Sequence, residues 1–457
     1  MSRSIRAFLL IASVLGSYAL QWALVKLTWG RGFAERWGRV HLRNARRLAD
    51  GFTALRGVFI KLGQVISVLG GFLPPVYREQ LQRLQDQVPP RPFSEMQGRL
   101  LEAFGPDALA RFGQLDQTAL AAASLAQVHR AQLPDGRKVA VKLLYPGIER
   151  LISRDLFVLR LFLPIIARVF PIVRFERVLN QLSAMLTREA DYENERRNMD
   201  RIRGIFERRD DVIVPLVVPE LTRGGVLTMS FEEGVRISDL LREEPGELAR
   251  RGIAREDVAR LLTDCYFTML FEHRVLHADP HPGNFLVRPG PSLVILDYGA
   301  VEDVTEPLAR GLKTVILGAL TRNTEQVLLG AEQMGFVAPG GDRELLREVG
   351  RSYLKTLATL QVSDFSSLDR GELHKLSGYE QVRGRLREVM RSVEYPDGYF
   401  YLERTLALLF GLVGLLEPVR GLPGVAAPLA SRMMLRSLAA RSHPPGPVKE
   451  EPGASSG

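Results

Sequence analysis

The chain has 457 residues, of which 46% are hydrophobic and 25% are charged, and this composition excludes a wholly disordered or collagen-like protein. Its single cysteine, Cys265, excludes a disulfide framework and a cysteine-based zinc site, because either would need partners. The net charge is +9, but residues 1–50 alone carry +7, so the basic excess is local and no nucleic-acid partner is predicted.

Residues 1–29 are predicted to form a membrane anchor or an interfacial helix. The run 7–25 is uncharged, and a helix of this length is about 28 Å long, close to the thickness of the hydrocarbon core of a bilayer. Two arginines precede this run and seven lysines or arginines follow it before residue 50, which orients the rest of the chain toward the cytoplasm. The tryptophans of the chain also lie in this region, at Trp22, Trp29 and Trp37. The alternatives are a helix packed within the protein and a signal peptide, and the absence of a small-residue cleavage site before the basic stretch argues against the signal peptide.

The rest of the chain shows helical and strand patterns that together predict an α+β fold. The pattern is helical over 30–115 and ends in a proline-rich turn at 88–92. Two strands joined by a turn at 134–136 are predicted over 121–145. Further along, we expect helices at 148–169 and 175–207, a hairpin at 212–231, and mainly helices over 236–440, interrupted by loops and strands at 277–301. Residues 442–457, rich in Pro, Gly and Ser, are predicted to be a disordered tail.

Polar residues typical of a kinase active site are concentrated at 277–299. Asp279 and Asn284 are five residues apart, and Asn284 and Asp297 are thirteen apart, as in the catalytic loop and the Asp-Phe-Gly motif of protein kinases. An apolar strand delivers Asp297 to its end, and Gly299 permits an unusual turn there. Carboxylate and amide oxygens suit Mg²⁺, so Asn284 and Asp297 are candidate metal ligands.

The two histidines of this region offer an alternative, a zinc site at His277 and His281. Pro280 and Pro282 argue against it, because they prevent the helix that would bring both imidazoles to one face. Magnesium is therefore the predicted metal.

Six short segments resemble, in their order along the chain, those of the UbiB/AarF-type atypical kinases. They are Lys61-Leu62-Gly63-Gln64, 121–129, 139–142, Glu189-Ala190-Asp191, 277–284 and Asp297-Tyr298-Gly299. The resemblance implies a protein-kinase-like two-lobed α+β fold with an N-terminal helical extension. It assigns the extension with its Lys-x-Gly-Gln motif to 30–115, the N-lobe to 116–235 and the helical C-lobe to 236–441.

The same resemblance implies roles for individual residues. Lys142, paired with Glu195, would hold the α- and β-phosphates, and Asp279 would act as the base or orienting residue. Taken alone, Lys142 would be interpreted as a solvated lysine at a strand edge, and Glu193 competes with Glu195 as its partner. The residues that would contact the nucleotide are Ala121, Ala122, Ala123, Ser124, Lys142 and Met229.

The alanine-rich turn differs from the glycine-rich loop of ordinary kinases. Ala121, Ala122 and Ala123 keep backbone N–H groups for phosphate oxygens, but alanine disfavours the positive φ angles open to glycine. The nucleotide is therefore expected to bind in a different pose. Ala126 adds to this difference, because many similar members of the family have glycine there.

A second difference is the helix that carries Lys61 and Gln64. These residues are three apart and share one helix face, which by itself indicates a solvated surface. The resemblance implies instead that this helix covers the active site where a peptide would bind, and that Lys61 meets Glu189 or Asp191. Only one of these acids is expected to reach Lys61, because residues i and i+2 of a helix point in different directions.

The family resemblance implies an atypical kinase or ATPase that binds Mg-ATP or Mg-ADP at the cytoplasmic face of a membrane. It also implies a role in isoprenoid-quinone (ubiquinone-type) biosynthesis or lipid handling, with a lipid or quinone precursor and biosynthetic enzymes as partners. No Ala-Pro-Glu motif follows Gly299, which argues against regulated peptide phosphorylation. Two alternatives remain open: a nucleotide-gated, non-catalytic scaffold, and a small-molecule phosphotransferase, although phosphotransferases of that kind lack the Lys-x-Gly-Gln helix.

Overall fold

The computed structural model divides the chain into two compact units. Unit 1 comprises Met1–Leu240 and Pro282–Val301, and unit 2 comprises Leu241–His281 and most of the chain from Glu302 onward. The residues that the structure describes are 3–27, 33–69, 74–82, 84, 90–169, 183–348, 351, 391–394 and 396–417. Trp29 and the tail predicted at 442–457 lie outside them.

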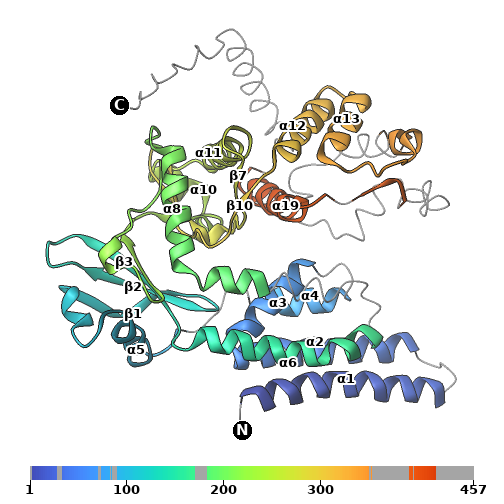
Figure 1. Cartoon of the computed structure of the whole chain (residues 1–457), viewed down its shortest axis with the longest axis horizontal. Helices are drawn as coiled ribbons and strands as arrows, with labels where there is room; N and C mark the ends of the chain where they lie inside the picture. The colour runs from blue at the N-terminus through green and yellow to red at the C-terminus, as the bar shows by residue number, and fades with distance from the viewer. Residues whose placement is uncertain are drawn as a thin grey trace, which may run out of the picture. The chain divides into compact units, whose positions relative to one another are not determined.

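Helices form much of the first part of unit 1 (Figure 1). They are α1 (Arg3–Leu27), α2 (Phe33–Leu55), α3 (Val58–Leu69), α4 (Pro75–Gln82), α5 (Phe93–Phe104) and α6 (Ile148–Val169). α1, α2, α3, α4 and α6 lie near one another, whereas α5 lies beside the first sheet of the unit. α1 packs on α2 and α6, and α4 packs on α2 and α3. These helices confirm the helix predicted at 148–169 and most of the helical pattern predicted over 30–115.

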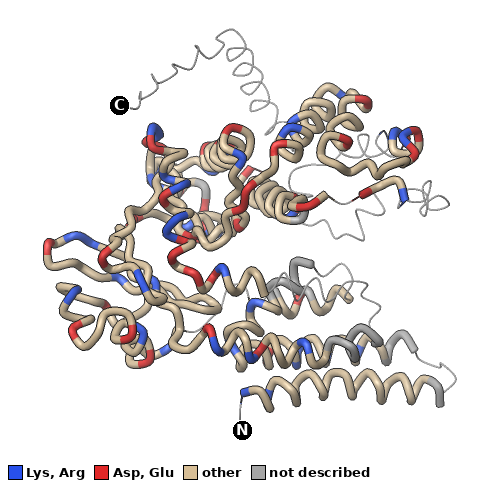
Figure 2. Tube along the Cα trace, viewed as in Figure 1, with Lys and Arg blue, Asp and Glu red and all other residues tan. Residues whose placement is uncertain are grey.

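Helix α1, the predicted membrane segment, is packed along one side. Ala7, Ile11, Val14 and Tyr18 are buried, at the three- and four-residue spacing of one helix face. Figure 2 shows almost no charge along α1 between its ends, and of the described helices only α1 is long and apolar enough to cross a membrane. α1 therefore packs through one face and exposes an apolar face opposite it, and membrane anchoring stays a prediction. That face includes Ile5, Phe8, Leu9, Leu20, Trp22 and Leu24.

Two four-stranded sheets complete unit 1. In spatial order, the first is β1 (Gln114–Ala122), β2 (Ala126–Gln132), β3 (Lys138–Leu144) and β5 (Val226–Ser230), all antiparallel. The second is β4 (Val212–Ile213), β9 (Ser292–Ile295), β8 (Phe285–Arg288) and β6 (Val235–Arg236). Short helical turns are η2 (Ala108–Arg111), η3 (Pro219–Leu221), α9 (Ile237–Leu240) and η5 (Pro282–Asn284).

The first sheet contains one strand more than the sequence indicated. The predicted pair is present as β2 and β3, joined by a turn in which Gly136 has a φ of 88°. β1 is the correction, because it begins at Gln114, inside the stretch assigned to helix. The residues of β1 are all exposed or half-buried, so the strand has no alternation of buried and exposed positions. It forms because it pairs with β2.

The hairpin predicted at 212–231 is confirmed in part, because antiparallel bridges join Val217 to Met229 and Arg223 to Val226. Its first residues and the main partner of β5 differ from the prediction. β4 pairs in parallel with β9 in the second sheet, whereas β5 pairs with β3 in the first. Residues 216–218 do run antiparallel to β5, where Val218 N donates to Thr228 O at 2.8 Å. Hydropathy identified the apolar segments, but it could not choose among several strands that offer an edge.

Helix α8 (Tyr192–Phe206) follows a break in the helix that the sequence predicted over 175–207. The structure describes this stretch from residue 183 onward and finds two helices in it. Asp191 separates them and caps α8, where its side chain accepts a hydrogen bond from Asn194 N at 3.0 Å. An aspartate in this position satisfies an N–H group that the first turn would leave unpaired.

The described part of unit 2 is mainly helical, as predicted. Its elements are α10 (Pro245–Arg250), α11 (Arg255–Phe267), η4 (Thr268–Glu272), β7 (Val275–His277), β10 (Val301–Asp303), α12 (Glu306–Leu320), α13 (Thr324–Met334) and α19 (Tyr399–Leu416). The first residue of β10, Val301, belongs to unit 1. Glycines allow α12 and α13 to approach closely: a Cβ atom placed on Gly311 would lie only 2.5 Å from Gly330 O. α19 packs on α11, the helix that leads toward β7 and the 277–284 motif.

Candidate functional site

A group of three charged side chains lies in unit 1, on β3, on α8 and just after β9. Lys142 Nζ lies 2.6 Å from Glu195 Oε1 and 3.7 Å from Asp297 Oδ2. The side chains of Lys142 and Glu195 are 14% and 1% exposed, whereas that of Asp297 is 42% exposed. Lys142 is therefore held by one buried carboxylate and faces a second carboxylate that solvent reaches.

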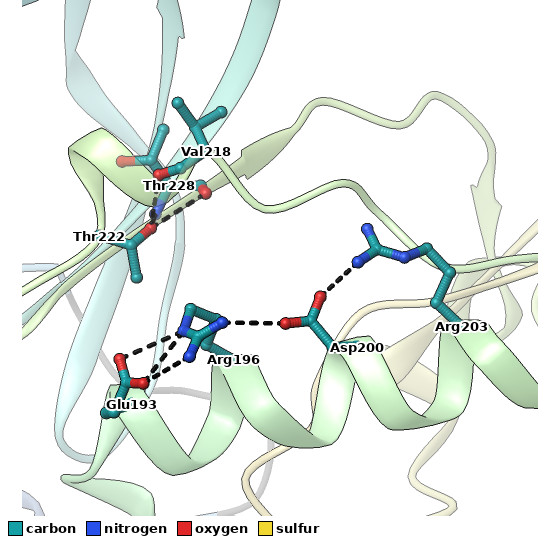
Figure 3. A network of polar contacts seen from close by, with 7 residues as sticks. All are labelled: Glu193, Arg196, Asp200, Arg203, Val218, Thr222 and Thr228. Carbon is teal, nitrogen blue, oxygen red and sulfur yellow. Dashed lines mark hydrogen bonds and ion pairs between the residues drawn. The ribbon is translucent and has the colours of Figure 1, made fainter. Parts of the chain in front are cut away.

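The local sequence explains how Glu195 comes to lie inside. The buried residues of α8 are spaced by three and four along the helix. They are Tyr192, Glu195, Met199, Ile202 and Phe206. Glu193 lies outside this stripe and pairs with Arg196 at the surface (Figure 3). The structure thus pairs Lys142 with Glu195, as the family resemblance implied, and helix periodicity would have favoured the same choice.

Burial shapes the ionisation of this group. Burial raises the pKa of Glu195 to about 7; Lys142 opposes this shift, and the Asp297 carboxylate adds to it. Burial lowers the pKa of Lys142, but Asp297 and Glu195 together outweigh burial and hold this pKa above its ordinary value. Lys142 is therefore a stable cation in a water-poor position, which suits it to phosphate oxygens.

Asn284 and Asp297, the candidate Mg²⁺ ligands, are linked through the backbone. Asn284 O accepts a hydrogen bond from Leu296 N at 2.9 Å, so the end of η5 lies beside the residue before Asp297. Asp297 Oδ1 accepts a hydrogen bond from Gly299 N at 2.9 Å, while Oδ2 is the atom nearer to Lys142. Among the described residues, no group of three or more His, Cys, Asp or Glu side chains could hold a metal ion by itself. One carboxylate and one amide fit a Mg²⁺ ion that phosphates and water also coordinate.

Lys61 on α3 connects the N-terminal helices to this group. It forms an ion pair with Glu189, and the two side chains are 15% and 24% exposed. Asp191 instead caps α8, so one of the two acids pairs with Lys61, as expected. The break in the helix after Glu189 directs the two acidic side chains to different partners. A Cβ atom placed on Gly299 would lie 3.9 Å from Glu189 Cγ, so Glu189 lies beside the turn that follows the candidate metal ligand. The side chain of Gln64 lies outside the described residues.

The alanine-rich turn between β1 and β2 is tightly closed. Ala122 pairs with Gln127 in the sheet, and Ala123 N donates to Ala126 O at 2.7 Å. The N–H group of Ala123 is therefore occupied, which corrects the expectation that it is available to phosphate. Ser124 follows at the tip, and its side chain is buried.

Met229, the remaining predicted nucleotide contact, lies on β5. It pairs in register with Ala140, two residues before Lys142. Its side chain is buried within unit 1, and its contact with a nucleotide stays a prediction.

Asp279, the predicted base, belongs to unit 2, where its neighbour is a residue that the sequence did not single out. Arg404 Nη2 on α19 lies 3.7 Å from Asp279 Oδ1. The next residue, Thr405, donates its hydroxyl to Ala278 O at 3.3 Å. No motif marked Arg404, because it lies far along the chain in a segment whose only signal was helical. α19 therefore adds a cation to the predicted catalytic loop.

The histidines considered for zinc have other surroundings. His277 is buried, and its Nδ1 atom is hydrogen bonded to Tyr266 Oη at 2.9 Å. His281 donates its backbone N–H to Asp279 O at 2.8 Å. In the part of the chain that the structure describes, neither histidine belongs to a group of three metal-ligating side chains.

Comparison with known proteins relates this site to a family. Residues 83–329, more than half of the chain, match the ABC1 atypical kinase-like domain. The chain is 34% identical over 302 residues to AarF domain-containing protein kinase 1 of Xenopus laevis, which covers 65% of the chain and 57% of that protein. It is 28% identical over 416 residues to the chloroplastic protein ACTIVITY OF BC1 COMPLEX KINASE 8 of Arabidopsis thaliana, which covers 85% and 54%. The chain thus spans little more than half the length of these relatives.

A solved structure has a similar fold. The complex of Rv3197 with erythromycin, from Mycobacterium tuberculosis, matches with a TM-score of 0.55 and 25% identity, over 79% of this chain and 89% of that chain. Together with the helices and sheets described above, these matches confirm the predicted α+β, kinase-like fold with an N-terminal helical region.

Proposed function

The chain belongs to the ABC1 atypical kinase-like family, the UbiB/AarF type that its motifs predicted, and we propose that it is an atypical kinase or ATPase. Its ligand in this proposal is Mg-ATP or Mg-ADP. The observation that carries the proposal is Lys142, held by the buried Glu195 and facing the solvent-accessible Asp297. Relatives that are named as kinases support it.

In this proposal, unit 1 binds the nucleotide. Lys142 contacts the α- and β-phosphates, and Glu195 holds the ammonium group ready so that binding needs little reorganisation. Asn284 and Asp297 hold Mg²⁺, which when bound neutralises phosphate charge and polarises the phosphoryl group. Asp279, five residues before Asn284 in the sequence, orients the attacking oxygen.

The proposed phosphoryl acceptor is water or a small or lipid-like molecule, not a peptide. Lys61 pairs with Glu189 beside Gly299, so the N-terminal extension takes up space next to the candidate metal ligand. The sequence after Gly299 also lacks the Ala-Pro-Glu motif of peptide kinases. Both features suit a role in isoprenoid-quinone biosynthesis or lipid handling, with a lipid or quinone precursor and biosynthetic enzymes as the proposed partners.

The proposed site of action is the cytoplasmic face of a membrane, with α1 lying in the interface instead of spanning it. The buried face of α1 makes polar contacts, since Tyr18 Oη is hydrogen bonded to His41 Nδ1 at 2.7 Å. A helix surrounded by lipid would lose such a contact at a cost. The opposite face exposes Phe8, Leu20 and Trp22, which suits the boundary between headgroups and acyl chains.

Flotation with anionic liposomes tests this proposal. The double variant Leu20→Gln and Trp22→Gln should weaken liposome binding, because it removes apolar area from the exposed face of α1. Leu329→Gln, at an exposed leucine of unit 2, is the matched control. Binding that the double variant retains but high salt abolishes would indicate attachment by the basic residues alone.

The nucleotide assignment is tested by Mg-dependent thermal stabilisation with ATP or ADP. Asp297→Asn should abolish this stabilisation, because it removes one charge from a site with few protein ligands. Asp200→Asn, on the exposed face of α8, is the control. If Asp297→Asn is stabilised as well as the parent protein, the metal assignment is wrong.

A second candidate function is a nucleotide-gated scaffold without turnover. The closed alanine turn, in which Ala123 N–H is already hydrogen bonded, favours it, because fewer donors remain for a transferring phosphoryl group. ATP hydrolysis with and without anionic liposomes and a quinone-precursor mimic separates the two functions. A scaffold would bind nucleotide and show no hydrolysis that lipid stimulates.

A further inference from the structure

Arg91, just before α5, is held against the first sheet. The buried Gln127 side chain grips the backbone of Arg91 from both sides: Oε1 accepts from Arg91 N at 2.9 Å, and Nε2 donates to Arg91 O at 3.2 Å. A buried amide with both ends satisfied fixes its partner in one register. The chain therefore enters α5 from a point that is hydrogen bonded to β2.

A histidine behind Gln127 fixes the orientation of this clamp. Gln127 Nε2 lies 2.9 Å from His129 Nε2, and His129 Nδ1 lies 2.8 Å from Asp116 O. A carbonyl oxygen only accepts, so His129 carries its proton on Nδ1 and accepts the hydrogen bond from Gln127 at Nε2. Burial lowers the pKa of His129, which suits this neutral form. With its amide so oriented, Gln127 cannot turn over without losing hydrogen bonds at both ends.

The side chain of Arg91 extends the clamp toward the alanine turn. Its guanidinium group lies 4.0 Å from the centre of the Tyr145 ring, which is a close cation–π contact. The buried Tyr145 donates its hydroxyl to Ala123 O at 3.2 Å and its backbone N–H to Leu125 O at 2.9 Å. Tyr145 thus bonds the turn at two points, and Ala123 N is held by Ala126 O.

We propose that Tyr145 and Arg91 are positioning residues for the nucleotide, and that together they hold the alanine turn in one conformation. Arg91 fixes the Tyr145 ring, and the Tyr145 hydroxyl fixes the Ala123 carbonyl. A turn held in one conformation loses less entropy when phosphate binds. This inference rests on the proposed function, because it takes the alanine turn as part of the nucleotide site.

Nucleotide titration of the full chain tests the inference. Tyr145→Phe keeps the ring for Arg91 and removes only the hydroxyl. The Kd for Mg-ATP should rise about fivefold, or about 1 kcal/mol, because the released turn must be ordered when phosphate binds. Tyr77→Phe is the matched control, because it also removes a buried, hydrogen-bonded hydroxyl, on α4. It should leave Kd unchanged whatever it does to the melting temperature.

A second variant tests the link to Arg91. Arg91→Met keeps much of the side-chain stem, removes the cation from the Tyr145 ring, and should raise Kd by a similar factor. The double variant should raise Kd no more than the larger single effect, because both changes break one chain of contacts. Arg111→Met is the control, since it removes a guanidinium that lies 5.4 Å from the Phe104 ring.

The outcomes separate this inference from the proposed function. If Tyr145→Phe binds Mg-ATP with the parent Kd, or if the two variants act additively, the inference is overturned while the nucleotide site stands. If the parent protein binds no Mg-nucleotide, the proposed function fails first, and the inference falls with it. A change in Kd shared equally by the control variants would reduce Tyr145 and Arg91 to a general role in stability.

Discussion

Helix α8 carries charges on two faces, and their surroundings differ. On the buried face, Glu195 pairs with Lys142 at 2.6 Å, with 1% and 14% of these side chains exposed. The exposed face carries a ladder of ion pairs along the helix (Figure 3), formed by Glu193, Arg196, Asp200 and Arg203. Acids and bases pair at similar distances on both faces, so distance alone cannot tell the two regions apart.

The two faces differ in their access to water. Water screens the ladder, and each of its charges remains solvated if its partner is removed. Inside, a charge that loses its partner has no water to replace it, and the cost of burying it remains. The buried pair should therefore control stability and ligand binding, whereas the ladder should contribute little. Lys61 and Glu189, which are partly buried, should fall between them.

The largest effect is expected from breaking the buried pair. Lys142→Ala should lower the free energy of unfolding by about 4 kcal/mol near pH 8, because Glu195 is left buried without its cation. Lys138→Ala is the matched control on the same strand, where Lys138 and Glu233 are 66% and 73% exposed. Urea denaturation measures both variants, and similar losses in the two would contradict the comparison.

The pH dependence of stability sharpens the comparison. The pKa of Glu195 is about 7 in the folded protein against an ordinary value of 4.5, so the folded state binds this proton more tightly. The resulting stability is fully present below pH 4.5 and is lost as pH rises toward 7, by up to about 3 kcal/mol. Glu195→Gln cannot titrate and should show a smaller fall between these pH values. A pH profile of the melting temperature that is the same in parent and variant would contradict the assignment.

The intermediate case is the pair between Lys61 and Glu189. A double-mutant cycle with Lys61→Ala and Glu189→Ala should give a coupling of about 1 kcal/mol in the free energy of unfolding, as expected for a partly buried pair. The affinity for Mg-nucleotide should change by about fivefold in each single variant, because Glu189 lies beside Gly299. If both variants bind Mg-nucleotide as the parent protein does, Lys61 is an ordinary surface residue, as its spacing from Gln64 alone indicated.

The smallest effect is expected on the ladder. Arg196→Ala should lower the free energy of unfolding by only about 0.3 kcal/mol per ion pair lost, and added salt should erase the difference. The measurement is urea denaturation at low and high salt, with nucleotide titration alongside. A loss above about 1 kcal/mol that persists in high salt would show that the exposed face resembles the buried one.

Several parts of the site could be predicted from the sequence because they depend on neighbouring residues. The spacing of Asp279, Asn284 and Asp297 is a property of one loop and one strand, and Lys142 lies in a Val-rich strand. The three- and four-residue spacing of buried positions in α8 includes Glu195 and leaves out Glu193. Strand β1 could not be predicted in the same way, because none of its residues is buried.

The sequence by itself determined which residue types the site contains, which stretches form most helices and strands, and that 7–25 is an uncharged helix. Tertiary structure alone decided which distant residues meet: Arg404 with Asp279, and Tyr145 with Ala123. It also decided which face of α1 packs, because a run that is apolar on all sides has no pattern to mark its buried side. Hydrophobic periodicity indicates which side of a segment is buried. Contacts between distant segments depend instead on how whole helices and strands pack, and no pattern of neighbouring residues in the sequence indicates them.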